Sequence, residues 1–121
     1  MASFARVIYP YYCGNNYYAA KYIIVEYDKN ELLRAIKKKR TEAKKLLRRL
    51  EKLSNDLKIL SRLCPTIDCQ EYMNSKRFEF ETEILEELGV KYEKEVITCP
   101  DEPPHFGDDY PSGVLLSLLI P

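Results

Sequence analysis

The sequence predicts an α+β fold in a single domain that spans residues 1–121, and three patterns lead to this prediction. A segment rich in aromatic and β-branched residues comes first, a long basic helical repeat follows it, and a shorter acidic helical repeat comes third. We therefore expect an N-terminal β-hairpin, a long coiled-coil-like helix, a shorter second helix, and C-terminal strands that complete an antiparallel sheet.

The hairpin is predicted over residues 4–27. Residues 4–9 and 17–27 are rich in Tyr, Ile and Val, which favour strands. Gly14, Asn15 and Asn16 lie between them, and Gly and Asn tolerate the positive φ angles of tight turns.

The long helix is predicted over residues 30–64. Asp28 or Asn30 can cap its first turn, and Pro65 ends it. Its length would be about 50 Å at 1.5 Å per residue. Residues at alternating steps of four and three form an a/d seam, in which only Lys39 is charged: Leu32, Ile36, Lys39, Ala43, Leu46, Leu50, Leu53, Leu57, Leu60 and Cys64.

One short second helix cannot cover so long a seam, so the seam predicts a homodimer. The residues expected at that interface are the apolar members of the seam: Leu32, Ile36, Leu46, Leu50, Leu53, Leu57 and Leu60.

Residues 66–88 form the acidic helical segment, which Thr66 can cap. Met73, Phe80, Ile84 and Leu88 recur at helical spacing. Because its charge is opposite to that of the first helix, the two helices are expected to form an antiparallel hairpin.

Residues 90–120 are predicted to hold two strands and an acidic loop. Residues 90–98 alternate as an exposed strand does, and residues 100–112 contain four prolines and several carboxylates. Residues 113–120 are almost entirely apolar, which indicates a strand buried on both faces or lying in a subunit interface.

The two halves of the chain carry opposite charge. Residues 1–65 hold 15 Lys and Arg and 6 Asp and Glu, a net +9, whereas residues 66–121 hold 4 and 13, a net −9. A cationic helix binds nucleic-acid phosphates through counterion release. The residues expected to do so lie mostly outside the seam: Arg34, Lys37, Lys38, Lys45, Arg48 and Lys52. The alternative is a solvated helix face that is partly paired with the acidic helix.

Tyrosines and cysteines give two further candidate sites. Seven tyrosines cluster in the hairpin and suit base stacking or sheet packing: Tyr9, Tyr11, Tyr12, Tyr17, Tyr18, Tyr22 and Tyr27. The four cysteines are expected as buried thiols, with a Cys64–Cys69 disulfide or a four-cysteine zinc site with Cys13 and Cys99 as alternatives.

Residues 79–95 resemble the opening of restriction-endonuclease-like nuclease domains, in which an acidic helix leads through Gly into a strand. Such nucleases need a later acidic pair with a Lys, and no Lys or Arg follows Glu95. His105 and the acidic loop match no catalytic or calcium-binding motif. We therefore expect no enzymatic activity and no cofactor.

The sequence thus predicts a non-enzymatic nucleic-acid-binding or regulatory protein that acts as a homodimer on DNA or RNA. The alternative is a protein–protein interaction module, such as a coiled-coil adaptor, a viral structural protein or an inhibitor. Without a targeting signal or a long apolar run, it is expected in the cytoplasm, in a virus-infected host cell or in a virion, and not in a membrane. Its 31% charged residues and single Gln are typical of thermophilic, archaeal or archaeal-virus proteins.

Overall fold

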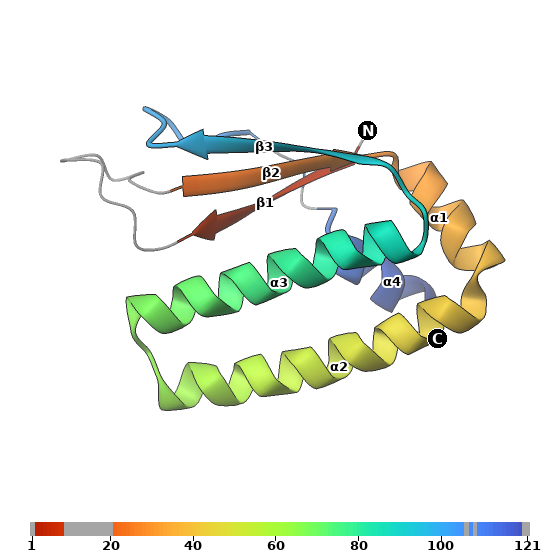
Figure 1. Cartoon of the computed structure of the whole chain (residues 1–121), viewed down its shortest axis with the longest axis horizontal. Coiled ribbons are helices and arrows are strands. Elements are labelled where there is room, and N and C mark those ends of the chain that lie inside the picture. The colour runs from red at the N-terminus through yellow and green to blue at the C-terminus, as the bar shows by residue number, and fades with distance from the viewer. Residues whose placement is uncertain (1, 9–20, 106, 108, 120–121) are drawn as a thin grey trace.

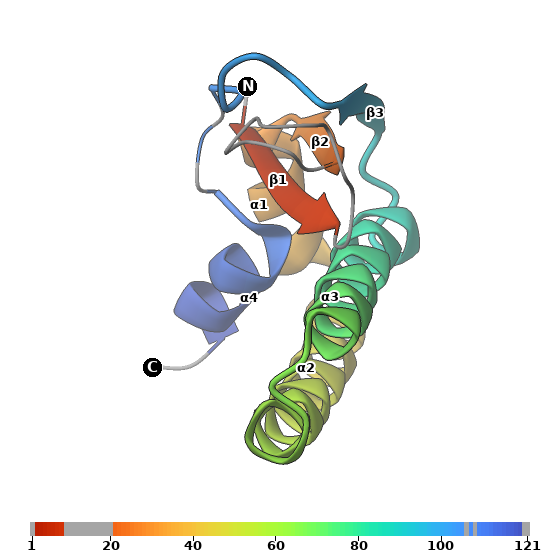
Figure 2. The same cartoon turned by 90° about the vertical axis from the view of Figure 1, so that its left-hand side faces the viewer.

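The computed structural model describes residues 2–105, 107 and 109–119, except for residues 9–20. It confirms the α+β class: helices pack on one face of a three-stranded antiparallel sheet with strand order β1-β2-β3 (Figure 1 and Figure 2). The elements, in chain order, are β1 (Ala2–Ile8), β2 (Lys21–Tyr27), α1 (Lys29–Lys38), α2 (Arg40–Leu63), α3 (Ile67–Glu87), β3 (Tyr92–Thr98) and α4 (Pro111–Leu119).

The predicted hairpin and the first of the two predicted C-terminal strands are confirmed. β1 pairs with β2 from Ala2 opposite Tyr27 to Ile8 opposite Lys21, and β3 pairs with the other edge of β2. The turn expected at residues 13–16 lies outside the described residues. Because side chains alternate along a strand, Phe4, Val25 and Tyr27 share the inner face and enter the core.

The second helix is also confirmed, and it runs antiparallel to α2 (Figure 1). The hydroxyl oxygen of Thr66 accepts a hydrogen bond from the Cys69 amide at 3.2 Å, as expected of its cap. Asp28 caps α1 in the same way, because its carboxylate accepts from the amides of Asn30 and Glu31.

The single helix predicted over residues 30–64 is wrong, because the chain breaks at Lys39 into α1 and α2. Lys39 has φ −108° and ψ 50°, outside the helical region. Leu32 and Ile36 of α1 are buried in the core beside the sheet, whereas α2 lies along α3 and α4. One straight helix cannot pack both beside the sheet and along α3 and α4. The bend falls at the only charged position of the seam (Figure 1).

The strand predicted over residues 113–120 is also wrong, because this segment forms α4. Pro111 lies in its first turn, where the missing amide costs nothing. Pro111, Val114 and Leu115 are buried, a spacing of three and four that buries one side of a helix. A short apolar run does not distinguish strand from helix by periodicity. In the part of the chain that the structure describes, no helix combines the length and apolar character needed to cross a membrane.

A buried ion pair joins the sheet to the helices. The Arg6 guanidinium on β1 binds the Glu81 carboxylate on α3, whose side chain is 2% exposed. Ser112 of α4 donates to the same carboxylate at 3.3 Å, and the Tyr110 ring lies 4.3 Å from the guanidinium carbon. Burial raises the pKa of Glu81, and the hydrogen bonds from Arg6 and Ser112 oppose that rise.

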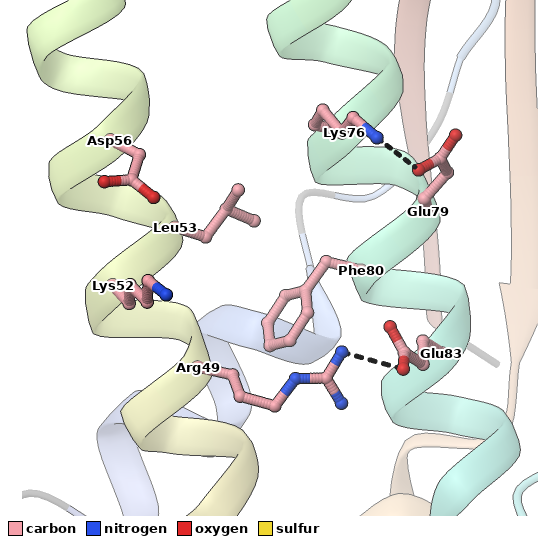
Figure 3. A pocket seen from close by; sticks show the side chains of 8 residues that line it. All are labelled: Arg49, Lys52, Leu53, Asp56, Lys76, Glu79, Phe80 and Glu83. Carbon is pink, nitrogen blue, oxygen red and sulfur yellow. Dashed lines mark hydrogen bonds and ion pairs between the residues drawn. The ribbon is translucent and has the colours of Figure 1, made fainter.

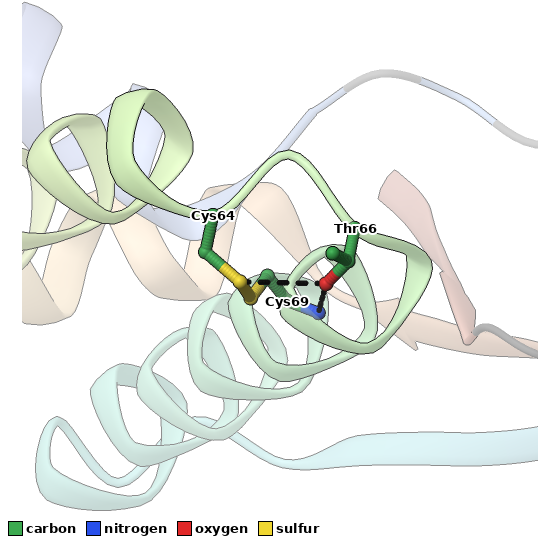
Figure 4. Close-up of a disulfide and its surroundings, with 3 residues drawn as sticks. All are labelled: Cys64, Thr66 and Cys69. Carbon is green, nitrogen blue, oxygen red and sulfur yellow. Dashed lines mark hydrogen bonds between the residues drawn. A yellow bond between two sulfur atoms is a disulfide. The ribbon is translucent and has the colours of Figure 1, made fainter.

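A disulfide joins Cys64 and Cys69 across the turn between α2 and α3 (Figure 4). Cys99 is disulfide-bonded as well. The expectation of unpaired thiols is therefore wrong at these three cysteines, and the alternative Cys64–Cys69 pairing is correct. Their Cα atoms lie 6.0 Å apart because the short turn brings the end of α2 against the first turn of α3.

We predict that removing one partner of the buried ion pair is strongly destabilising. Glu81→Ala or Arg6→Ala should each lower the free energy of unfolding by about 3–5 kcal/mol, since the remaining charge stays buried without a partner. The double variant should cost less than the sum of the two. Urea denaturation measures these values.

The matched control for this prediction is Lys29→Ala, which breaks the half-exposed pair between Lys29 and Asp109. It should cost at most about 1 kcal/mol. Equal losses for Glu81→Ala and Lys29→Ala would contradict the role assigned to the buried pair.

We also predict that Cys64→Ser/Cys69→Ser lowers the free energy of unfolding by about 2 kcal/mol, since the disulfide restricts the unfolded chain. Hydrogen exchange should accelerate mainly in the turn and in the adjoining ends of α2 and α3. An unchanged denaturation midpoint together with unchanged exchange in the turn would refute this prediction.

Candidate nucleic-acid interface

The bend at Lys39 places the predicted cations on two helices that meet at an angle (Figure 1). Lys39 itself is half-buried, and its ammonium lies close to Gly89. A Cβ added to Gly89 would stand 3.5 Å from the Lys39 Nζ atom. Gly89 follows the carboxyl end of α3, where a cation is favoured by the helix dipole. Lys39 therefore places its charge beside the carboxyl end of α3.

Arg34, Lys37 and Lys38 lie on α1 and are exposed. Leu32 and Ile36, on the opposite side of the same helix, are almost fully buried. The amphipathic spacing of α1 thus fixes the direction of its cations, because burying one side against the core turns the other side toward solvent.

Lys45, Arg48 and Lys52 lie on α2 and are exposed. Their steps of three and four place them on one side of the helix, away from the buried Ala43 and Leu46. Lys44 is exposed next to them and adds to the same positive surface. We refer to the six predicted cations of α1 and α2 as the basic face.

The acidic helix α3 reaches the basic segment at Arg49. The Arg49 guanidinium binds Glu83 at 2.7 Å and Glu87 at 3.2 Å, and it lies over the Phe80 ring at 5.5 Å (Figure 3). The hydrogen bond that Arg49 donates to the Glu83 carboxylate is the main cause of the raised pKa of Arg49. The two helices are thus joined by this group, which is not one of the six predicted residues.

The six cations of the basic face form no ion pair with any residue that the structure describes. The ion pairs between described residues take their cations from Arg6, Lys29, Arg49 and Lys76. Glu81 points into the core toward Arg6, and Glu83 and Glu87 bind Arg49. Within the described chain, the acidic half therefore leaves the basic face uncovered.

The predicted interface seam is used largely inside the chain. Leu32, Ile36, Leu46 and Leu57 are each at most 3% exposed. The other three members, Leu50, Leu53 and Leu60, are partly buried between α2 and its neighbours. The homodimer stays a prediction, but only these last three members keep surface that a second chain can reach.

The other candidate sites gain no support from the described residues. Tyr22 and Tyr27 are buried in the sheet, and the other five clustered tyrosines lie outside the described residues. Among the described residues, no three His, Cys, Asp or Glu side chains come close enough to hold a metal ion. The disulfide also removes the thiolates that a zinc site at Cys64 and Cys69 would need.

The sequence prediction missed the buried Arg6–Glu81 pair. Arg6 is a charge inside an apolar strand, and Glu81 follows the buried Phe80, so each stands among core positions. Their positions among core residues indicate that both side chains are buried. That they pair with each other, across 75 residues of sequence, depends on how α3 crosses the sheet.

Comparison with protein-family models, with curated proteins and with solved structures finds no match to this chain.

Proposed function

We propose that the protein is a non-enzymatic nucleic-acid-binding protein that contacts phosphates through the basic face. The observation that carries this proposal is that its six cations are exposed and unpaired among the described residues. An exposed cation without a nearby carboxylate can bind a phosphate directly and release the counterions condensed on the nucleic acid. A cation that is already paired must first break its ion pair.

The arrangement favours contacts to the sugar–phosphate backbone over reading of bases. Lys and Arg dominate both helices of the basic face, and the sequence lacks the Asn-rich pattern of basic-region zippers, which read base edges. Contacts of this kind position a protein on nucleic acid without strong sequence preference. DNA and RNA are both possible ligands for such binding. The bend between α1 and α2 divides the cations into two short segments.

Six phosphate contacts would make the affinity strongly dependent on salt. The logarithm of the binding constant should fall with the logarithm of salt concentration with a slope of about −5 on duplex DNA. A salt slope near zero would show that the cations do not meet phosphate.

A protein–protein interaction module is the second candidate function. Apolar side chains exposed where α2 meets α3 favour it, among them Leu63 at 78% exposure. A module of this kind would bind a partner protein and show no salt-dependent affinity for nucleic acid.

We predict that Lys45→Glu/Arg48→Glu weakens binding to duplex DNA by at least about tenfold near 100 mM salt and flattens the salt slope. Arg34→Glu/Lys37→Glu/Lys38→Glu should act in the same direction. Fluorescence anisotropy with labelled duplex DNA, single-stranded DNA and RNA measures these effects and ranks the three ligands.

The matched control is Lys58→Glu/Arg62→Glu, which makes the same change of net charge at exposed positions farther along α2. Its affinity should stay within about threefold of the parent protein, because the control lies outside the basic face. Equal losses for both double variants would indicate a general effect of net charge, and no binding by the parent protein would reject the proposal.

A further inference from the structure

The outer half of the helical hairpin carries a groove that the rest of the described chain does not fill. It lies between α2 and α3, has a volume of about 510 Å³, and is lined mainly by apolar side chains: Leu53, Leu57, Leu60, Cys69 and Tyr72. Leu53, Asp56 and Lys76 also line the adjoining pocket in Figure 3, where the sheet and α4 lie behind the two helices. The groove is thus on the side of the hairpin away from the core.

Large apolar side chains stand exposed beside this groove. Tyr72 lines it and is 52% exposed, while Ile59 and Leu63 of α2 are 55% and 78% exposed. Leu63 lies one turn beyond Leu60, so it extends the same apolar surface toward the disulfide. We refer to the groove together with Ile59 and Leu63 as the hairpin patch. A contiguous apolar surface of this kind is typical of an interaction site.

The charges around the hairpin patch favour a second copy of the same chain. Asp56, Asp68 and Lys76 line the groove, so it carries charges of both signs. Asp56 and Asp68 form no ion pair with any described residue. In a two-fold interface a surface meets itself, so it must carry both signs to be complementary. A nucleic acid would need one sign, and that surface is the basic face.

The size of the surface also fits a dimer. The outer half of the hairpin comprises residues 53–63 of α2 and 67–76 of α3. Only one side of these two helices can meet a second chain, which is about half of the residues that a standard stable interface uses on each side, so the surface fits a small, reversible interface. Two such hairpins bring four helices together, the arrangement that buries an incomplete helical seam most simply.

We propose that the hairpin patch binds the hairpin patch of a second copy, so that α2 and α3 of both chains form a four-helix assembly. Leu53 and Leu60, only partly buried in one chain, become core residues of this assembly. The basic face stays outside it, because Lys45 and Arg48 lie in the inner half of α2. The proposal does not depend on nucleic-acid binding.

The test is the molar mass of the full-length, oxidised protein, measured by light scattering and sedimentation velocity from about 1 to 100 μM. The parent protein should reach twice the chain mass within this range. Leu63→Glu/Tyr72→Glu should remain at the mass of one chain, with at least about a tenfold weaker self-association. Both positions are exposed, so the circular dichroism spectrum should not change.

The matched control is Val96→Glu/Leu116→Glu, because Val96 on β3 and Leu116 on α4 are exposed apolar residues outside the hairpin patch. This variant should dimerise like the parent protein. A parent protein that stays monomeric, a dimer that persists in Leu63→Glu/Tyr72→Glu, or a dimer lost only in the control would each overturn the proposal. Anisotropy with duplex DNA on the same samples reports the basic face separately.

Discussion

The carboxylate of Glu81 is buried where the sheet, α3 and α4 meet, and the packing of these parts depends on how its charge is satisfied. Arg6 reaches it from β1 and Ser112 from α4, so one acidic group fixes the positions of three elements. A buried charge tolerates few partner geometries, which makes it selective among possible packings. The same contact holds β1 against α3, where Asn74 donates to the Val7 carbonyl at 2.8 Å and so covers the outer edge of the sheet.

This constraint also decides which acids can reach the basic segment. With Glu81 directed into the core, one side of α3 faces the sheet, and Glu83 and Glu87 reach across to Arg49 of α2. Arg49 lies on the side of α2 next to α3, whereas Lys45 and Arg48 point to solvent. Among the described residues, the acids of α3 therefore meet the cations of α2 at Arg49, and the net zero charge of the chain hides an exposed cationic surface.

Local signals predicted the elements well where they were strong, and failed where packing decided the outcome. Asp28 and Thr66 act as caps at the predicted ends, because a cap depends only on neighbouring residues. The break at Lys39 arises because the first part of one periodic segment is buried beside the sheet and the second part is buried against α3 and α4. The periodicity shows which residues are buried, but it does not show that they are buried against different elements. The six cations of the basic face could be predicted as exposed from their place opposite the seam, but the absence of acidic partners among the described residues depends on the direction of α3.

The solvent side of α2 changes character along its length. Lys45, Lys52 and Ile59 are seven residues apart and all exposed, so they lie along one side of the helix. Its inner half is cationic, and its outer half exposes Ile59 and Leu63 beside a groove with charges of both signs. Phosphate binding requires hydrated, unpaired cations, whereas self-association requires apolar surface that leaves water, so the two cannot share the same residues. Separation along one helix satisfies both requirements, and an association through the outer half would place two basic faces in a single particle and strengthen their joint hold on one nucleic acid.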